Sequence, residues 1–299
     1  ELPLRQEPEE IICEPKAYLN ELMMDDNSGQ PSAKEVFDTT PYTILVVDDN
    51  PDMTDFLKRT FEGYFKRIII AGDGGEALQL VRSHVPDIIV SDVMMPRMNG
   101  YKLCKTIKED INISHIPVIL LTARDDRQSQ ISGYKNGADG YLSKPFEVEM
   151  LMELIRNRLK NREYTKKRYL NAGLIPTPEE STISLTDETF LIKLNSIIQE
   201  NIENSNLGIQ FICQEVGLGR SSLYNKLKAL TGMGANEYIS KLRIEKAITL
   251  ISGTDMPFSE IAEKTGFTTP SYFSTAFKQY TGETPSQYKE RKKKGLADK

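Results

Sequence analysis

Four short apolar runs in the first half of the chain each end at a polar or charged residue, and this pattern constrains the fold more than any other feature. The runs span residues 42–47, 87–91, 116–121 and 140–143, and the first three contain several β-branched residues. Short buried strands that alternate with helical stretches are typical of a parallel sheet covered on both faces. We therefore expect a doubly wound α/β domain, with helices beginning near Pro51, Gly74, Gly100, Gln128 and Phe146.

The residues at the ends of these strands suggest one kind of chemistry. Asp48 and Asp49 follow the first run, and Asp92, Thr122 and Lys144 end the other three. Parallel strands end at one edge of a sheet, where open α/β folds bind ligands. Three close carboxylates repel one another unless a cation neutralises them, and their oxygen atoms favour Mg²⁺. A carboxylate nucleophile, a metal, a hydroxyl and an ammonium group are what phosphoryl transfer onto a carboxylate requires.

With these five positions in this order, residues 42–160 resemble the receiver domain of response regulators, the CheY-like fold. The resemblance implies that Asp92 accepts the phosphoryl group. It implies that Mg²⁺ binds to Asp48, Asp49, Asp92 and the backbone carbonyl of Met94.

The same resemblance implies roles for the remaining positions. Thr122 and Lys144 are expected to contact the phosphoryl group, and Thr122 and Tyr141 to form the conformational switch. Phosphorylation is expected to produce a homodimer through the fourth helix, the strand that carries Tyr141, and the fifth helix, which is expected over residues 147–162.

Composition and charge divide the chain further. At 299 residues with a net charge of −5 it is long enough for two domains. Residues 1–40 are strongly acidic and are expected to be a solvated segment, residues 41–162 the α/β domain, and residues 163–185 a linker broken by two prolines and a glycine. The three cysteines form no metal-binding motif.

After Thr186, which is expected to cap a helix, the sequence is helical throughout and includes two segments of the same layout. Each has an apolar helix, a turn glycine, a helix with a polar face and a Thr-Gly end; the turn glycines are Gly217 and Gly266. Such a unit is a helix-turn-helix, and two copies about 50 residues apart are a strong signal.

Over about residues 190–292 this layout resembles the AraC/XylS family of DNA-binding domains, and we expect residues 186–299 to form such a domain. The resemblance implies that the second helix of each unit enters the major groove. The residues expected to contact base edges are Ser221, Tyr224, Asn225, Pro270, Ser271, Tyr272, Ser274 and Thr275. The residues expected to contact phosphates are Arg220, Lys226, Lys228 and Lys278. Leu223, Leu227, Phe273 and Phe277 are expected in the core.

Together the two resemblances predict a transcription factor of a two-component phosphorelay that is switched by phosphorylation and is not itself an enzyme. Its expected partners are double-stranded DNA, a histidine kinase, a second copy of the chain and RNA polymerase. The chain starts with Glu1, so we expect it to be the C-terminal part of a hybrid sensor kinase. Because no apolar run reaches about 20 residues, we expect the segment to be cytoplasmic, with its parent chain anchored in the inner membrane.

Two alternatives remain open at this stage. An aspartyl-phosphate phosphohydrolase would use the same carboxylates, but such enzymes place a second acid two residues after the nucleophile, where this chain has Met94. A DNA-binding protein that ignores phosphorylation would bind DNA equally with and without a phosphoryl donor.

Overall fold

The computed structural model describes residues 36–123, 137–171 and 184–297. The described residues from Phe37 onward belong to one unit. The helix expected from Gln128, and nearly all of the acidic segment expected over residues 1–40, lie outside the described residues.

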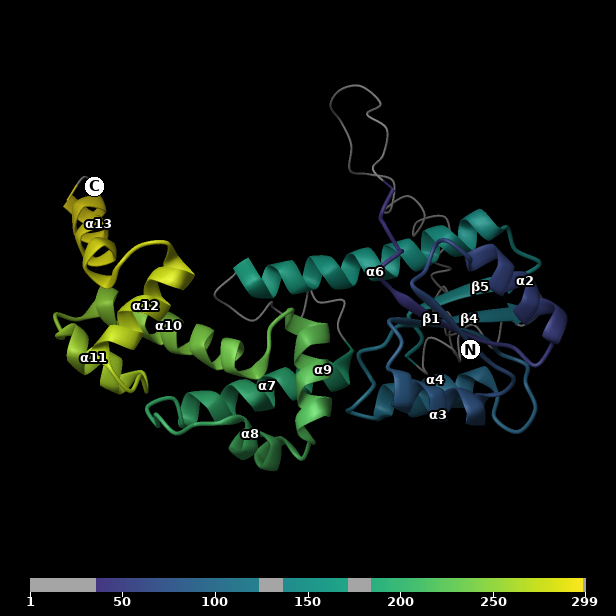
Figure 1. Ribbon diagram of the computed structural model, residues 1–299, viewed down its shortest axis with the longest axis horizontal. Coiled ribbons are helices and arrows are strands. Elements are labelled where there is room, and N and C mark those ends of the chain that lie inside the picture. The colour runs from purple at the N-terminus through teal and green to yellow at the C-terminus, as the bar shows by residue number, and fades with distance from the viewer. Residues whose placement is uncertain (1–35, 124–136, 172–183, 298–299) are drawn as a thin grey trace, which may run out of the picture. The chain divides into compact units, whose positions relative to one another are not determined.

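The N-terminal domain is built on a five-stranded parallel sheet, which confirms the predicted doubly wound α/β fold (Figure 1). The strands are β1 (Thr43–Val47), β2 (Arg67–Ala71), β3 (Ile88–Asp92), β4 (Val118–Ala123) and β5 (Gly140–Lys144). Their order is β2-β1-β3-β4-β5, so the chain reverses its direction of winding beside β1 and β3. Ligands bind to such folds at the carboxyl ends of the strands, near this reversal.

Alternate residues of each strand enter two separate cores, one on each face of the sheet. On one face Leu45 and Ile89 pack against α3 (Gly74–His84) and α4 (Gly100–Glu109). On the other face Ile44 and Val90 pack against α2 (Pro51–Phe61) and α6 (Val148–Asn171). Figure 1 shows these pairs of helices on opposite sides of the sheet. Burial on both faces explains why the strands are continuously apolar rather than alternating.

Helix α6 is longer than the sequence predicted. Its expected end was residue 162, where the chain becomes basic, but the helix continues to Asn171. Leu151 and Ile155 belong to the core of the α/β domain, while Tyr169 is buried in a cluster with Phe190 and Leu194 of the C-terminal domain. One continuous helix therefore contributes side chains to the cores of both domains.

The C-terminal domain is helical throughout its described residues, as predicted. Its helices are α7 (Leu185–Glu200), α8 (Ile209–Val216), α9 (Arg220–Thr231), α10 (Ala235–Gly253), α11 (Phe258–Lys264), α12 (Pro270–Thr281) and α13 (Pro285–Ala297). The prediction that Thr186 caps the first of these was wrong. Ser184 is the N-cap, because its hydroxyl accepts a hydrogen bond from the amide of Asp187 at 3.2 Å.

Two helix-turn-helix units, α8–α9 and α11–α12, are joined by α10. Tyr238 and Ile239 near the start of α10 enter the core of the first unit, and Ile244 and Ala247 enter the core of the second. The turn in the second unit needs its glycine for two reasons. Gly266 has a φ of +72°, and a Cβ there would lie 2.2 Å from the backbone oxygen of Ile202.

Candidate functional site

Asp48, Asp92 and Lys144 meet at the carboxyl edge of the sheet. The Lys144 ammonium lies 2.6 Å from Asp92 Oδ1 and 2.9 Å from Asp48 Oδ2. Asp48 and Asp92 are buried, whereas Asp49 beside them is exposed. The strand ends thus bring together two carboxylates and the ammonium group, as the strand pattern predicted.

Thr122 and Met94 lie beside this group. The Thr122 hydroxyl is buried and has no hydrogen-bond partner among the described residues, so it is available to donate to a group bound at Asp92. The amide of Met94 donates to Asp92 Oδ2 at 2.6 Å. The loop from Asp92 to Gly100 is tight, since a Cβ on Gly100 would lie 2.2 Å from the Asp92 backbone oxygen.

Burial and charge act in opposite directions on these groups. Burial raises the pKa of Asp92, the nearby Asp48 charge raises it further, and Lys144 only partly offsets this. Burial lowers the pKa of Lys144, but hydrogen bonds to Asp92 and Asp48 outweigh burial and raise it above its usual value. The ammonium is therefore held in its charged form against the two carboxyl groups.

The arrangement fits a divalent cation in part. Oxygen atoms of Asp48 and Asp92 already converge on one cation, the Lys144 ammonium, and carboxylate oxygen atoms are the ligands that Mg²⁺ prefers. Within the described ranges, however, no three His, Cys, Asp or Glu side chains are gathered closely enough to hold a metal. The predicted set of Asp48, Asp49 and Asp92 is therefore not gathered into a metal-binding cluster in this structure.

Tyr141 lies on β5 and packs, half-buried, against the core on the α3–α4 face. It is thus beside β4, which carries Thr122. The fourth helix of the expected dimer surface lies outside the described residues, so only Tyr141 and α6 of that surface are described.

The first recognition helix, α9, has one exposed face and one buried face. Ser221, Tyr224, Asn225 and Lys228 are exposed, and so is Arg220 at its start. Leu223 and Leu227 are buried, as predicted.

The prediction that Lys226 contacts a DNA phosphate was wrong. The Lys226 side chain has no exposed surface and its ammonium pairs with Asp187, so it is not available to a phosphate group. Its partner, Asp187, was not predicted as a functional residue either. An isolated basic residue on a polar helix gives no signal that distinguishes a buried pair from a surface charge.

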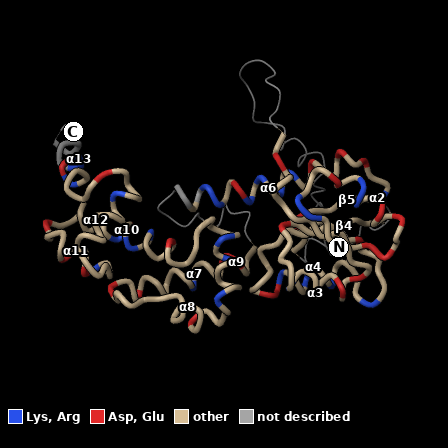
Figure 2. Tube along the Cα trace, in the orientation of Figure 1, with Lys and Arg blue, Asp and Glu red and all other residues tan. Residues whose placement is uncertain are grey.

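The second recognition helix, α12, follows the same plan. Pro270, Ser271, Tyr272, Thr275 and Lys278 are exposed and Ser274 is half-buried, while Phe273 and Phe277 are fully buried as predicted. Neither recognition helix has an acidic residue: α9 carries Arg220, Lys226 and Lys228, and α12 carries only Lys278. Over the helices of the C-terminal domain as a whole, Figure 2 shows basic and acidic residues interspersed. With so little excess of positive charge, base contacts must supply much of any discrimination between DNA sequences.

Two family models match separate parts of the chain. Residues 44–156 match the response regulator receiver domain family, and residues 212–291 match a helix-turn-helix domain family. Histidine kinase P4 of Formosa agariphila is 41% identical over 249 residues, which cover 83% of this chain and 18% of that protein. DNA-binding response regulator MtrA of Mycolicibacterium smegmatis is 36% identical over 46% of this chain and 58% of MtrA. Response regulator MprA of Mycobacterium sp. (strain KMS) is 36% identical over 51% of this chain and 70% of that protein.

The chain thus spans less than a fifth of the kinase and just over half of MtrA. Among the helices that the structure describes, none combines the length and the apolar character needed to cross a bilayer.

Proposed function

Since the chain belongs to the response-regulator family and carries a helix-turn-helix domain after its receiver domain, we propose that it is a transcription factor whose DNA binding is controlled by phosphorylation of Asp92. The observation that carries this proposal is the meeting of Asp48, Asp92 and Lys144 at the carboxyl edge of the sheet.

In the proposed reaction an oxygen of the Asp92 carboxylate attacks the phosphorus atom of a phosphohistidine. The new P–O bond forms as the P–N bond breaks, and the imidazole nitrogen leaves and takes up a proton. Lys144 is already 2.6 Å from Asp92 and offsets negative charge on the phosphoryl oxygens. Thr122, which has no partner among the described residues, donates a hydrogen bond to one of them.

Mg²⁺ would be held by Asp48, Asp49, Asp92 and the Met94 carbonyl, where it would neutralise charge on the phosphoryl group. Lys144, which pairs with both Asp48 and Asp92, would contact the phosphoryl oxygens. Asp49→Ala removes one ligand and should raise the Mg²⁺ concentration needed for phosphorylation. Asp55→Ala, an aspartate on α2 outside this set, serves as the matched control.

Phosphorylation is proposed to act through Thr122 and Tyr141. When Thr122 moves toward the phosphoryl group, the half-buried ring of Tyr141 turns into the space that it leaves. This change favours a homodimer, and the second domain then binds two DNA half-sites.

DNA recognition is assigned to the exposed faces of α9 and α12. Asn225 is suited to a bidentate pair with adenine, and Ser221, Tyr224, Pro270, Ser271, Tyr272, Ser274 and Thr275 are the other residues proposed to contact base edges. Arg220 and Lys228 are assigned to the DNA backbone.

The phosphoryl donor is proposed to be a histidine kinase, and RNA polymerase to be the partner at promoters. The similarity to histidine kinase P4 supports the proposal that this segment belongs to a longer chain that carries its own kinase. A phosphohydrolase is disfavoured because the Met94 side chain offers no acid or base two residues after Asp92.

The assignment of Asp92 is tested by mass. The chain is incubated with acetyl phosphate and Mg²⁺, and its intact mass is measured. We expect one added phosphoryl group on the wild type and none on Asp92→Asn, whereas Asp87→Asn, at the opposite end of the same strand, should be phosphorylated normally. A phosphoryl group on Asp92→Asn would overturn the assignment.

A further inference from the structure

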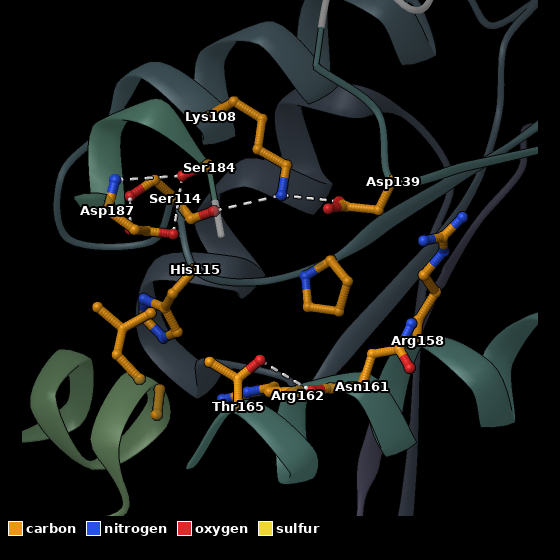
Figure 3. A pocket seen from close by; sticks show the side chains of 13 residues that line it. Lys108, Ser114, His115, Asp139, Arg158, Asn161, Arg162, Thr165, Ser184 and Asp187 are labelled. Carbon is orange, nitrogen blue, oxygen red and sulfur yellow. Dashed lines mark hydrogen bonds and ion pairs between the residues drawn. The ribbon is translucent and has the colours of Figure 1, made fainter. Parts of the chain in front are cut away.

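A buried polar group joins the receiver domain to the first recognition helix. Ser114, in the loop before β4, donates a hydrogen bond to Asp187 Oδ1 at 2.7 Å, and the Lys226 ammonium donates to Ser114 Oγ at 2.8 Å. Lys226 also pairs directly with Asp187. All three residues are at most 2% exposed. Figure 3 shows Ser114 and Asp187 side by side, with Ser184 at the second oxygen of Asp187.

Burial and pairing act against each other in this pair. Burial lowers the pKa of Lys226, and the charge and hydrogen bond of Asp187 only partly offset it. Burial raises the pKa of Asp187, but the charge of Lys226 and the hydrogen bonds from Lys226, Ser114 and Ser184 outweigh burial and hold that pKa below its usual value. A buried ion pair is stable only if its remaining hydrogen-bonding sites are satisfied. Ser184 supplies one bond from the DNA-binding domain itself, and Ser114 supplies another from the receiver.

Other contacts surround this group. The Thr186 hydroxyl donates to the backbone oxygen of Lys108 at 3.0 Å, and Ile111 packs against the core cluster that contains Phe190. From α6, Tyr169 enters the same cluster. The loop that contains residues 111–117 and the end of α6 therefore contact the DNA-binding domain together.

The contact lies on the face of α9 that is turned away from the residues proposed to read DNA. Ala229 and Leu230 line the pocket beside His115 and Arg162, and Lys226 is fully buried next to them. On the other face Tyr224 and Asn225 are exposed. The receiver therefore touches α9 without covering its proposed DNA-reading side chains.

We propose that receiver residues 111–117 form a docking surface for the back of α9, seated on the Asp187–Lys226 pair, and that this contact braces the recognition helix rather than masking it. The effect on DNA rests on the proposed function of α9, but the docking itself does not. A helix held in its binding position loses less conformational freedom on binding, so its affinity for DNA is higher.

Ser114→Ala tests the docking alone, because it leaves the Asp187–Lys226 pair intact and removes only the receiver's hydrogen bonds to it. Hydrogen exchange of residues 111–117 is measured in the full chain without DNA or phosphoryl donor. Loss of these bonds should raise the exchange rate about fivefold. Thr186→Ala removes a further hydrogen bond between the domains, the one to the Lys108 backbone oxygen, and should act in the same direction. Ser83→Ala is the matched control, because this exposed serine bonds only within its own helix and to His84. Unchanged exchange in both test variants would overturn the docking surface.

The affinity for a selected DNA site shows whether the receiver contact braces α9 in its DNA-binding position or masks it from DNA. With phosphoryl uptake unchanged, Ser114→Ala should weaken DNA binding about fivefold and leave the preferred sequence the same. Tighter binding would mean that the contact masks α9, and equal binding would mean that it has no influence; either result overturns the brace. If the wild type binds no specific DNA, the proposed function fails, whereas the exchange result still decides the docking.

Discussion

The two turn glycines of the helix-turn-helix units offer a controlled test of the fold. Gly217 and Gly266 have nearly the same left-handed backbone, with φ values of +73° and +72°, but different surroundings. A Cβ on Gly217 meets nothing within 4 Å. A Cβ on Gly266 would lie 2.2 Å from the Ile202 backbone oxygen and 2.8 Å from the Arg243 guanidinium.

Substitution by alanine should therefore cost different amounts. The left-handed conformation costs about 1–2 kcal/mol for alanine at either position. Gly266→Ala must also displace the backbone at Ile202 or the Arg243 side chain, which adds about 1–3 kcal/mol. We expect a loss of about 1–2 kcal/mol for Gly217→Ala and about 2–5 kcal/mol for Gly266→Ala.

Urea denaturation of the full chain, followed by circular dichroism, measures the two losses. The helical domain should unfold at a clearly lower urea concentration in Gly266→Ala than in Gly217→Ala. If the two variants unfold together, or if Gly217→Ala is the less stable one, the close approach of Gly266 to Ile202 is wrong.

Three further predictions concern recognition, pH and assembly. Asn225→Ala should relax the preference at one base position, at a cost of about 1–3 kcal/mol. Lys228→Ala should weaken binding to all sequences and reduce the salt dependence of binding. Sites selected from a random duplex library measure the first effect, and salt titrations measure the second. Burial raises the pKa of Glu245 from 4.5 to about 7, so the folded state binds its proton more tightly than the unfolded state. The free energy of unfolding should therefore fall as the pH rises from about 4.5 to 7. Glu245→Gln should therefore have a higher melting temperature than the wild type at pH 8 but not at pH 4.5, and an equal difference at both values would contradict this assignment. Phosphorylation should raise the sedimentation coefficient toward that of a dimer, and identical distributions at every concentration would count against dimerisation.

The sheet and its polar edge could be predicted because both depend on local order in the sequence. A continuously apolar run such as residues 87–91 needs burial on both faces, and parallel strands leave their carboxyl ends together. Asp48, Asp92 and Lys144 therefore meet although Asp48 and Lys144 are 96 residues apart. The core positions Leu223 and Phe277 follow in the same way from helical spacing.

Two of the errors arise where tertiary contacts decide the structure. Lys226 has the local sequence of a surface residue, and only Asp187, 39 residues earlier in the chain, explains its burial. The basic stretch after Arg162 suggested a linker, but the burial of Tyr169 in the second domain continues the helix. The partners of Lys226 and Tyr169 are not visible from the neighbouring residues. The error in the cap of α7 is different, because Ser184 and its partner Asp187 are only three residues apart and this spacing is a capping signal in the sequence.

The central claim, that a phosphoryl group on Asp92 controls DNA binding, is tested most directly by measuring the affinity of the full chain for its selected site with and without acetyl phosphate and Mg²⁺. Coupling between two sites of one protein typically changes affinity about 5- to 150-fold. We expect the wild type to bind more tightly by a factor in this range when phosphorylated, and Asp92→Asn to show no change. Equal affinity of the wild type in both conditions, or the same gain in Asp92→Asn, would contradict the account.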